Sequence, residues 1–173
     1  MTNAVPHSAM QFGSQATVLR REWGEWIAAQ GPWHVFGALT YDQRRYRGRT
    51  DTRYGAIPPD VTKAHAKRWL RDTNKVLDGR LEAAVLALEY QKNGWPHFHP
   101  LLRLAGGLHG NEFALAGGLW YGDHGYAKLE APRDAKDVTA YAAKYLSKGL
   151  DQGDVLIWPF KGPWPPHQRE LQP

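Results

Sequence analysis

Cysteine is absent from this chain of 173 residues. Its absence excludes disulfide bonds, thiolate metal sites and cysteine nucleophiles, so any bound metal must rest on histidine and oxygen ligands. No apolar run reaches the roughly 18 residues that a membrane-spanning helix needs. The first residues also lack the basic and apolar regions of a secretory signal. We therefore expect a cytoplasmic protein with no membrane or disulfide-linked partner.

A P-loop of the form Gly-x-x-x-x-Gly-Lys-Ser/Thr is also missing, which excludes a P-loop helicase within this sequence. What is present is positive charge, with a formal net charge of +5 and a pI near 9.5. Such a balance favours a polyanionic partner, because basic side chains neutralise phosphates and release counterions.

Arginine and tyrosine are interleaved between residues 42 and 59, in a stretch that follows a predicted strand. A solvated loop explains an arginine-rich stretch as well as nucleic-acid contact does. The candidate DNA-binding residues of this loop are Arg44, Arg45, Arg47 and Arg49.

The hydrophobic periodicity predicts one α+β domain over residues 1–173, with a flexible start at 1–15 and an irregular tail rich in Pro and Trp at 158–173. Helices are predicted at residues 16–30, 61–77 and 134–148, and strands at 33–41, 81–90, 97–104 and within 117–129. Asn93-Gly94 is a strong turn signal that joins strands 81–90 and 97–104 in a β-hairpin.

A candidate metal site lies on this hairpin. His97 and His99 alternate along a strand and therefore share a face, while Phe98 points to the opposite layer. Glu89 interrupts an apolar strand and can lie opposite the histidines, where a buried carboxylate needs a partner or a cation. Two imidazoles and one carboxylate leave positions open on a divalent ion, as a catalytic site requires. Arg103 shares this face and is either a phosphate contact or an ordinary surface arginine.

A second cluster lies on the helix predicted at 134–148, where Tyr141, Lys144, Tyr145 and Lys148 occupy one arc. A phenol with a pKa near 10 needs a nearby cation or base to act as a nucleophile, and the lysines supply cations. Tyr141 lies nearer the lysines and is the favoured nucleophile, with Tyr145 as its rival. By themselves the tyrosines are better explained as packing residues, but their combination with the histidines and Glu89 favours catalysis.

Three motifs in this order resemble those of the HUH endonuclease superfamily, the histidine-hydrophobe-histidine proteins of rolling-circle initiators, relaxases and related transposases. Leu39-Thr40-Tyr41 resembles the first motif, and Glu89 with Trp95-Pro96-His97-Phe98-His99 resembles the metal motif. The run from Tyr141 to Lys148 resembles the tyrosine motif. Because the histidines precede a doubled tyrosine, the chain is most similar to phage and plasmid replication initiators.

The resemblance implies a central antiparallel sheet of about five strands, ferredoxin-like or RRM-like, flanked by helices. It also implies that Glu89, His97 and His99 hold Mn²⁺ or Mg²⁺ while a tyrosine nicks single-stranded DNA at an origin. The products are a 5′-phosphotyrosine link and a free 3′-OH, which can later rejoin the strand. Implied partners are the origin DNA, a host helicase and the replication machinery of a bacterial or archaeal cell.

Other functions remain open at this stage. An HUH-type transposase or a relaxase-like strand transferase would use the same motifs. A non-catalytic single-stranded nucleic-acid-binding module leaves Glu89 and the histidines unexplained, and a plain metallohydrolase leaves the tyrosine helix unexplained. Pro100 removes a hydrogen-bond donor directly after the histidine pair, which predicts a bulge or an edge position there.

Overall fold

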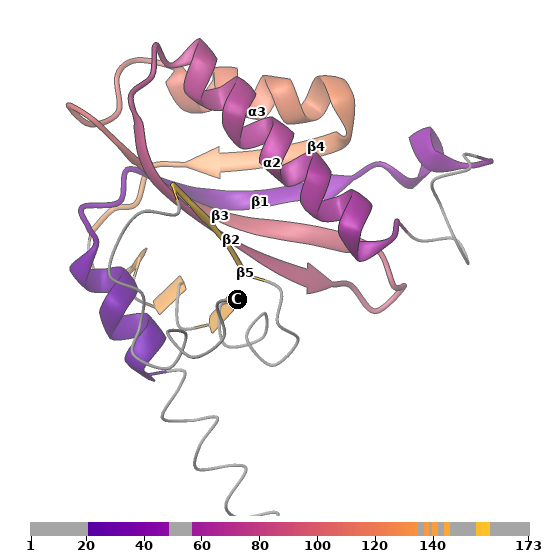
Figure 1. Cartoon of the computed structure of the whole chain (residues 1–173), viewed down its shortest axis with the longest axis horizontal. Coiled ribbons are helices and arrows are strands. Elements are labelled where there is room, and N and C mark those ends of the chain that lie inside the picture. The colour runs from indigo at the N-terminus through magenta and orange to yellow at the C-terminus, as the bar shows by residue number, and fades with distance from the viewer. Residues whose placement is uncertain are drawn as a thin grey trace, which may run out of the picture.

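The structure is a computed structural model that describes residues 21–48, 57–134, 137–138, 140–141, 144–145 and 155–159. Its centre is an antiparallel sheet of five strands in the order β4-β1-β3-β2-β5 (Figure 1). The strands are β1 (Val35–Tyr41), β2 (Leu81–Tyr90), β3 (Pro96–Leu104), β4 (Gly125–Glu130) and β5 (Val155–Trp158). The expected α+β fold with an antiparallel sheet flanked by helices is confirmed.

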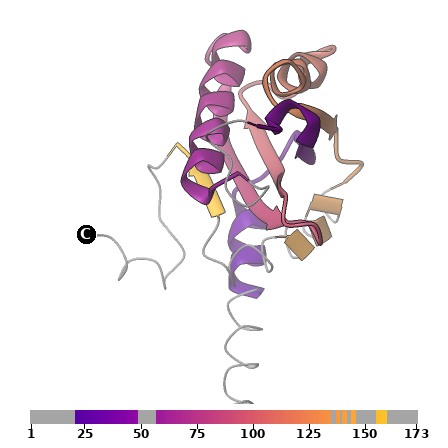
Figure 2. The same cartoon turned by 90° about the vertical axis from the view of Figure 1, so that its right-hand side faces the viewer.

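Two helices, α2 (Pro59–Val76) and α3 (Glu112–Asp123), cover one face of the sheet (Figures 1 and 2). Their buried residues recur at helical spacing, as Trp69 and Thr73 do on α2 and Ala116 and Trp120 on α3. The indole N–H of Trp69 donates to the Ala116 carbonyl at 2.9 Å and ties the two helices together. This face carries the larger of the two hydrophobic cores.

The opposite face carries a second core. Helical residues 21–29 bury Trp23 and Ile27 against Val85 and Leu101 of the sheet. Val138, Tyr141 and Tyr145 pack against the same core. Because strand side chains alternate between the faces, one layer of the sheet supports α2 and α3 while the other supports the segment that carries the tyrosines.

The hairpin of β2 and β3 forms as its turn signal predicts, and it places Glu89 directly opposite His97. Phe98 points to the other side, where it is 1% exposed and packs in the core beneath α2 and α3. The predicted alternation of His97, Phe98 and His99 is therefore confirmed.

Pro100 lies on an internal strand, between β1 and β2, and neither an edge position nor a bulge accommodates it. The pairing of β1 with β3 runs from Val35 and Leu102 to Thr40 and His97 in one register, but it skips two pairs, Gly37 with Pro100 and Ala38 with His99. Both skipped pairs need an N–H at position 100 that donates to the Gly37 carbonyl. The prediction of a bulge or edge was wrong, because a single missing donor can be replaced by a side chain.

The strand predicted within residues 117–129 is correct only in its second half. Residues up to Asp123 belong to α3, and β4 begins at Gly125. Three glycines at positions 117, 118 and 122 weaken the helical signal of this segment, and burial of Ala116 and Trp120 against the sheet overrides it.

Three further segments differ from the sequence prediction or lie partly outside the described residues. The loop after β1 contains a short 3-10 helix, η1 (Gln43–Tyr46), which the sequence did not predict. Strand β5 was also missed, and it takes Trp158 from the predicted tail. Residues 1–15, most of the tail and several positions of the helix predicted at 134–148 lie outside the described residues. None of the helices in the described part of the chain is long and apolar enough to cross a membrane.

Candidate metal centre and tyrosine pair

The three residues predicted to bind metal come together at the turn end of the hairpin. Glu89 Oε2 lies 3.1 Å from Nε2 of His97 and 3.1 Å from Nε2 of His99, and the two Nε2 atoms are 2.9 Å apart. The site is mostly enclosed, since the side chains of Glu89, His97 and His99 are 20%, 17% and 6% exposed. Among the described residues this is the one group of three or more such side chains that could hold a metal ion.

The geometry and chemistry of this triangle fit a divalent cation. Ligand atoms about 2.1 Å from one ion lie roughly 3 Å apart, which is the separation found here. A carboxylate oxygen and two imidazole nitrogens that converge on one point all offer lone pairs once the histidines are neutral. This donor set is that of a 2-His-1-carboxylate site with open coordination positions.

Burial keeps His99 neutral. Desolvation, followed by the neighbouring His97, lowers the pKa of His99 from 6.5 to about 4, although Glu89 acts in the opposite direction. A neutral imidazole is the form that binds a metal ion, so His99 is ready to act as a ligand at neutral pH.

The outer nitrogen of His97 has a partner that the sequence analysis missed. The side-chain amide of Gln91 lies 3.0 Å from His97 Nδ1. When His97 binds a cation through Nε2, its Nδ1 carries the proton and donates it to the amide oxygen of Gln91, which a 180° rotation of the amide provides. Alternation could have identified Gln91, because it lies two residues beyond Glu89.

The outer nitrogen of His99 is held by Tyr141. The Tyr141 hydroxyl donates to the Gly37 carbonyl, the group left without its strand partner by Pro100, and its oxygen lies 2.9 Å from His99 Nδ1. The hydroxyl therefore accepts the Nδ1 proton of His99, and this leaves Nε2 bare toward Glu89 and His97. Burial raises the pKa of Tyr141, which keeps the phenol protonated and able to donate.

Tyr145 and Lys144 complete the described part of the tyrosine motif. The Tyr145 ring stacks on His99, with ring centroids 3.6 Å apart and planes 21° apart. Its centroid is 4.6 Å from that of Tyr141, and Lys144 Nζ lies 4.8 Å from it. The structure thus brings both tyrosines and one lysine to the histidine pair, while Lys148 lies outside the described residues.

The candidate DNA-binding arginines are placed less uniformly. Arg44 and Arg45 lie on η1, Arg47 is exposed just after it, and Arg49 is outside the described residues. Arg103 pairs with Glu82 at 3.2 Å and donates to the Gln30 carbonyl. It lies six residues along β3 from His97, about 20 Å away. A DNA contact by Arg103 remains a prediction, and the structure gives this side chain a packing role.

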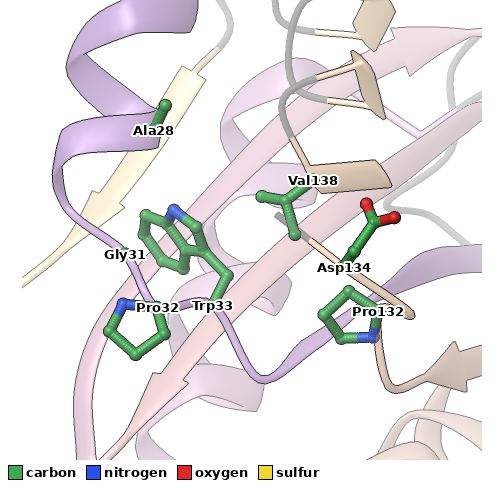
Figure 3. Close-up of a pocket in the computed structure, with 7 residues that line it drawn as sticks. All are labelled: Ala28, Gly31, Pro32, Trp33, Pro132, Asp134 and Val138. Atoms are coloured by element: carbon green, nitrogen blue, oxygen red, sulfur yellow. The ribbon is translucent and has the colours of Figure 1, made fainter. Parts of the chain in front are cut away.

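A pocket of about 410 Å³ also opens between residues 28–33 and 132–138, with Trp33 and Val138 on its walls (Figure 3). Most of its lining is apolar, and Asp134 is its one charged residue. Neither Glu89 nor the two histidines line it, so we assign it no part in the chemistry of the metal centre.

Comparison with known families agrees with this geometry. The family model for the replication-associated protein ORF2 matches residues 34–150, which include the hairpin and both tyrosines. No curated protein and no solved structure matches the chain.

Proposed function

Because the chain belongs to the replication-associated protein ORF2 family, we propose that it initiates rolling-circle replication by nicking and rejoining single-stranded DNA with the HUH endonuclease chemistry. The observation that carries the proposal is the convergence of Glu89, His97 and His99 on one point with Tyr141 and Tyr145 against His99. A nucleic-acid-binding module needs no such cluster. A metallohydrolase needs no tyrosines there.

In the proposed reaction a tyrosine oxygen attacks the scissile phosphorus while the bond from phosphorus to the 3′ oxygen breaks. The phenol proton passes to solvent, and the leaving oxygen takes up a proton to become a 3′-OH. The 5′ phosphate stays on the tyrosine until a 3′-OH reverses the step. A bound Mn²⁺ or Mg²⁺ would withdraw negative charge from the phosphate. Lys144, beside the Tyr145 ring, adds positive charge near the attacking oxygen.

The contacts of Tyr141 favour Tyr145 as the first attacking group, which differs from the preference drawn from helical spacing alone. The Tyr141 hydroxyl is engaged with the Gly37 carbonyl and with His99 Nδ1, the ring nitrogen that points away from Glu89. To attack, it must give up both contacts. We propose that Tyr145 attacks first, that Tyr141 holds His99, and that Tyr141 can act in the rejoining step.

The test is to incubate the full chain with a randomised single-stranded DNA library and Mn²⁺, then to isolate protein–DNA adducts that resist denaturant. We expect an adduct that disappears with EDTA and with His97→Ala. Sequencing the attached strands identifies the nick site. Cleavage without an adduct would favour the metallohydrolase, and binding without cleavage would favour the module.

The two tyrosines are separated with Tyr145→Phe and Tyr141→Phe, scored as adduct formed in one turnover on the identified strand. We expect Tyr145→Phe to abolish the first adduct and Tyr141→Phe to form it more slowly. The reverse pattern would return the first attack to Tyr141. Peptide mapping of the wild-type adduct identifies the attached residue independently of any variant.

A further inference from the structure

Two large aromatic side chains are exposed side by side near the metal centre. Tyr121, on the last turn of α3, is 56% exposed, and Tyr126, on β4, is 52% exposed. Their ring centroids are 6.5 Å apart. Exposed aromatic rings that gather in one place mark binding surfaces more often than isolated exposed residues do.

The register of the sheet relates Tyr126 to the metal centre. Thr40 pairs with Tyr126 on one side and with His97 on the other, and His97 pairs with Glu89. Residues directly opposite one another in a sheet project from the same face. Tyr126 therefore lies on the face of the metal ligands, two strand spacings or about 10 Å from His97.

This part of the sheet is open. The side chains of β4 that point to the metal-site face, at Tyr126, Lys128 and Glu130, are exposed, whereas Ala127 and Leu129 between them pack against the core under α2 and α3. Over β2 and β3 the same face is covered by the second core. A strand of nucleic acid could therefore reach the metal ligands from the β4 side without displacing packed side chains.

Two arginines hold the rings in position. Arg44 Nη2 donates to the Tyr126 hydroxyl at 2.9 Å, and the Arg45 guanidinium lies 5.3 Å from the centroid of the Tyr121 ring. Arg45 also donates to the Tyr121 carbonyl, which fixes η1 to α3. Asp42 pairs with Arg44 and offsets part of the positive charge. The exposed rings are therefore the main feature of the surface, with the arginines as supports.

We propose that Tyr121, Tyr126, Arg44 and Arg45 form a stacking surface for the bases of single-stranded DNA that continues from the scissile phosphate. Unpaired bases expose flat faces that stack on aromatic rings, whereas a duplex hides them. A surface fixed in advance loses little side-chain entropy when it binds. The choice of ligand rests on the proposed function, but the binding does not depend on cleavage.

The test is the affinity of the full chain for a fluorescent single-stranded oligonucleotide of mixed sequence, measured by anisotropy in EDTA so that no cleavage occurs. Replacement of one ring, by Tyr126→Thr or Tyr121→Ala, should weaken binding about 5-fold to 100-fold. Threonine suits a strand and keeps β4 intact. Tyr126→Phe retains the ring and should bind like the wild type. The salt dependence of binding should not change, because tyrosine carries no charge.

The matched control is Leu115→Ala, which removes an exposed apolar side chain, 48% exposed, from α3 outside this surface. It should bind DNA like the wild type. Wild-type affinity of Tyr126→Thr, or an equal loss in Leu115→Ala, would overturn the inference. A chain that loses affinity with the ring variants yet forms no adduct in Mn²⁺ would refute the proposed nicking and leave the stacking surface standing.

Discussion

Each histidine of the candidate metal centre is held from behind by a different kind of group. Gln91 reaches His97 Nδ1 from the end of β2, and Tyr141 reaches His99 Nδ1 from a helical segment distant in sequence. Such outer partners fix which ring nitrogen carries the proton, and they orient the other nitrogen toward the cation. The affinity of the site for a metal should therefore depend on residues that do not themselves bind it.

Gln91→Leu should lower the affinity for Mn²⁺ about 10-fold to 100-fold, because His97 loses the group that orients its ring. The measurement is calorimetric titration of the full chain with Mn²⁺ in the absence of DNA. Lys92→Ala, an exposed change at the next residue, serves as the control and should bind as the wild type does. Equal affinities for Gln91→Leu and the wild type would contradict the assigned role.

At the scale of elements, β1 links the metal centre to both neighbouring strands through one position. Gly37 has φ +158°, and a Cβ placed there would lie 1.9 Å from the Lys128 carbonyl oxygen of β4. Its own carbonyl receives the Tyr141 hydroxyl in place of the donor that Pro100 lacks. Close approach of the strands and support of the tyrosine segment therefore both depend on the absence of a side chain at this position.

Gly37→Ala should destabilise the fold by about 3 kcal/mol or more, because backbone strain and overpacking add. Gly118→Ala is the control, since a Cβ at this exposed position of α3 meets nothing within 4 Å. It should stabilise the helix by up to about 1 kcal/mol. Both changes are read as free energies of unfolding in urea, and a tolerated Gly37→Ala would show that β1 and β4 can separate without cost.

For the whole molecule, the buried histidine couples stability to pH. The pKa of His99 is lowered to about 4 in the folded chain, against 6.5 in the unfolded chain, so the unfolded state binds more protons between these values. The stability that His99 permits is fully present above about pH 6.5 and is lost as the pH falls toward about 4. The loss from this group is about 3 kcal/mol at most.

The prediction is tested by urea unfolding in EDTA from pH 4 to pH 7, with His99→Asn as the comparison. Asparagine does not titrate, so the difference between the two curves should shrink as the pH falls. Repeating the series with Mn²⁺ should raise the wild-type midpoint near neutral pH and leave His99→Asn almost unchanged, because a cation stabilises only the state that binds it. A constant difference at every pH would rule out this protonation.

Local patterns in the sequence determined much of the site. Alternation along a strand set His97 and His99 on one face, and the Asn93-Gly94 turn set Glu89 opposite them. The helical arc grouped Tyr141 with Tyr145 and Lys144. These features follow from neighbours in the chain, whose relative positions are fixed by backbone geometry.

Only the tertiary structure decided what these groups touch. The helical state of residues 112–123 and the strand β5 depend on burial against partners distant in sequence. The contact of Tyr141 with Gly37 and the alignment of Tyr126 with His97 depend on which strands pair and in which register. Long-range pairing is chosen by the packing of the whole core, and periodicity within one segment carries no information about it.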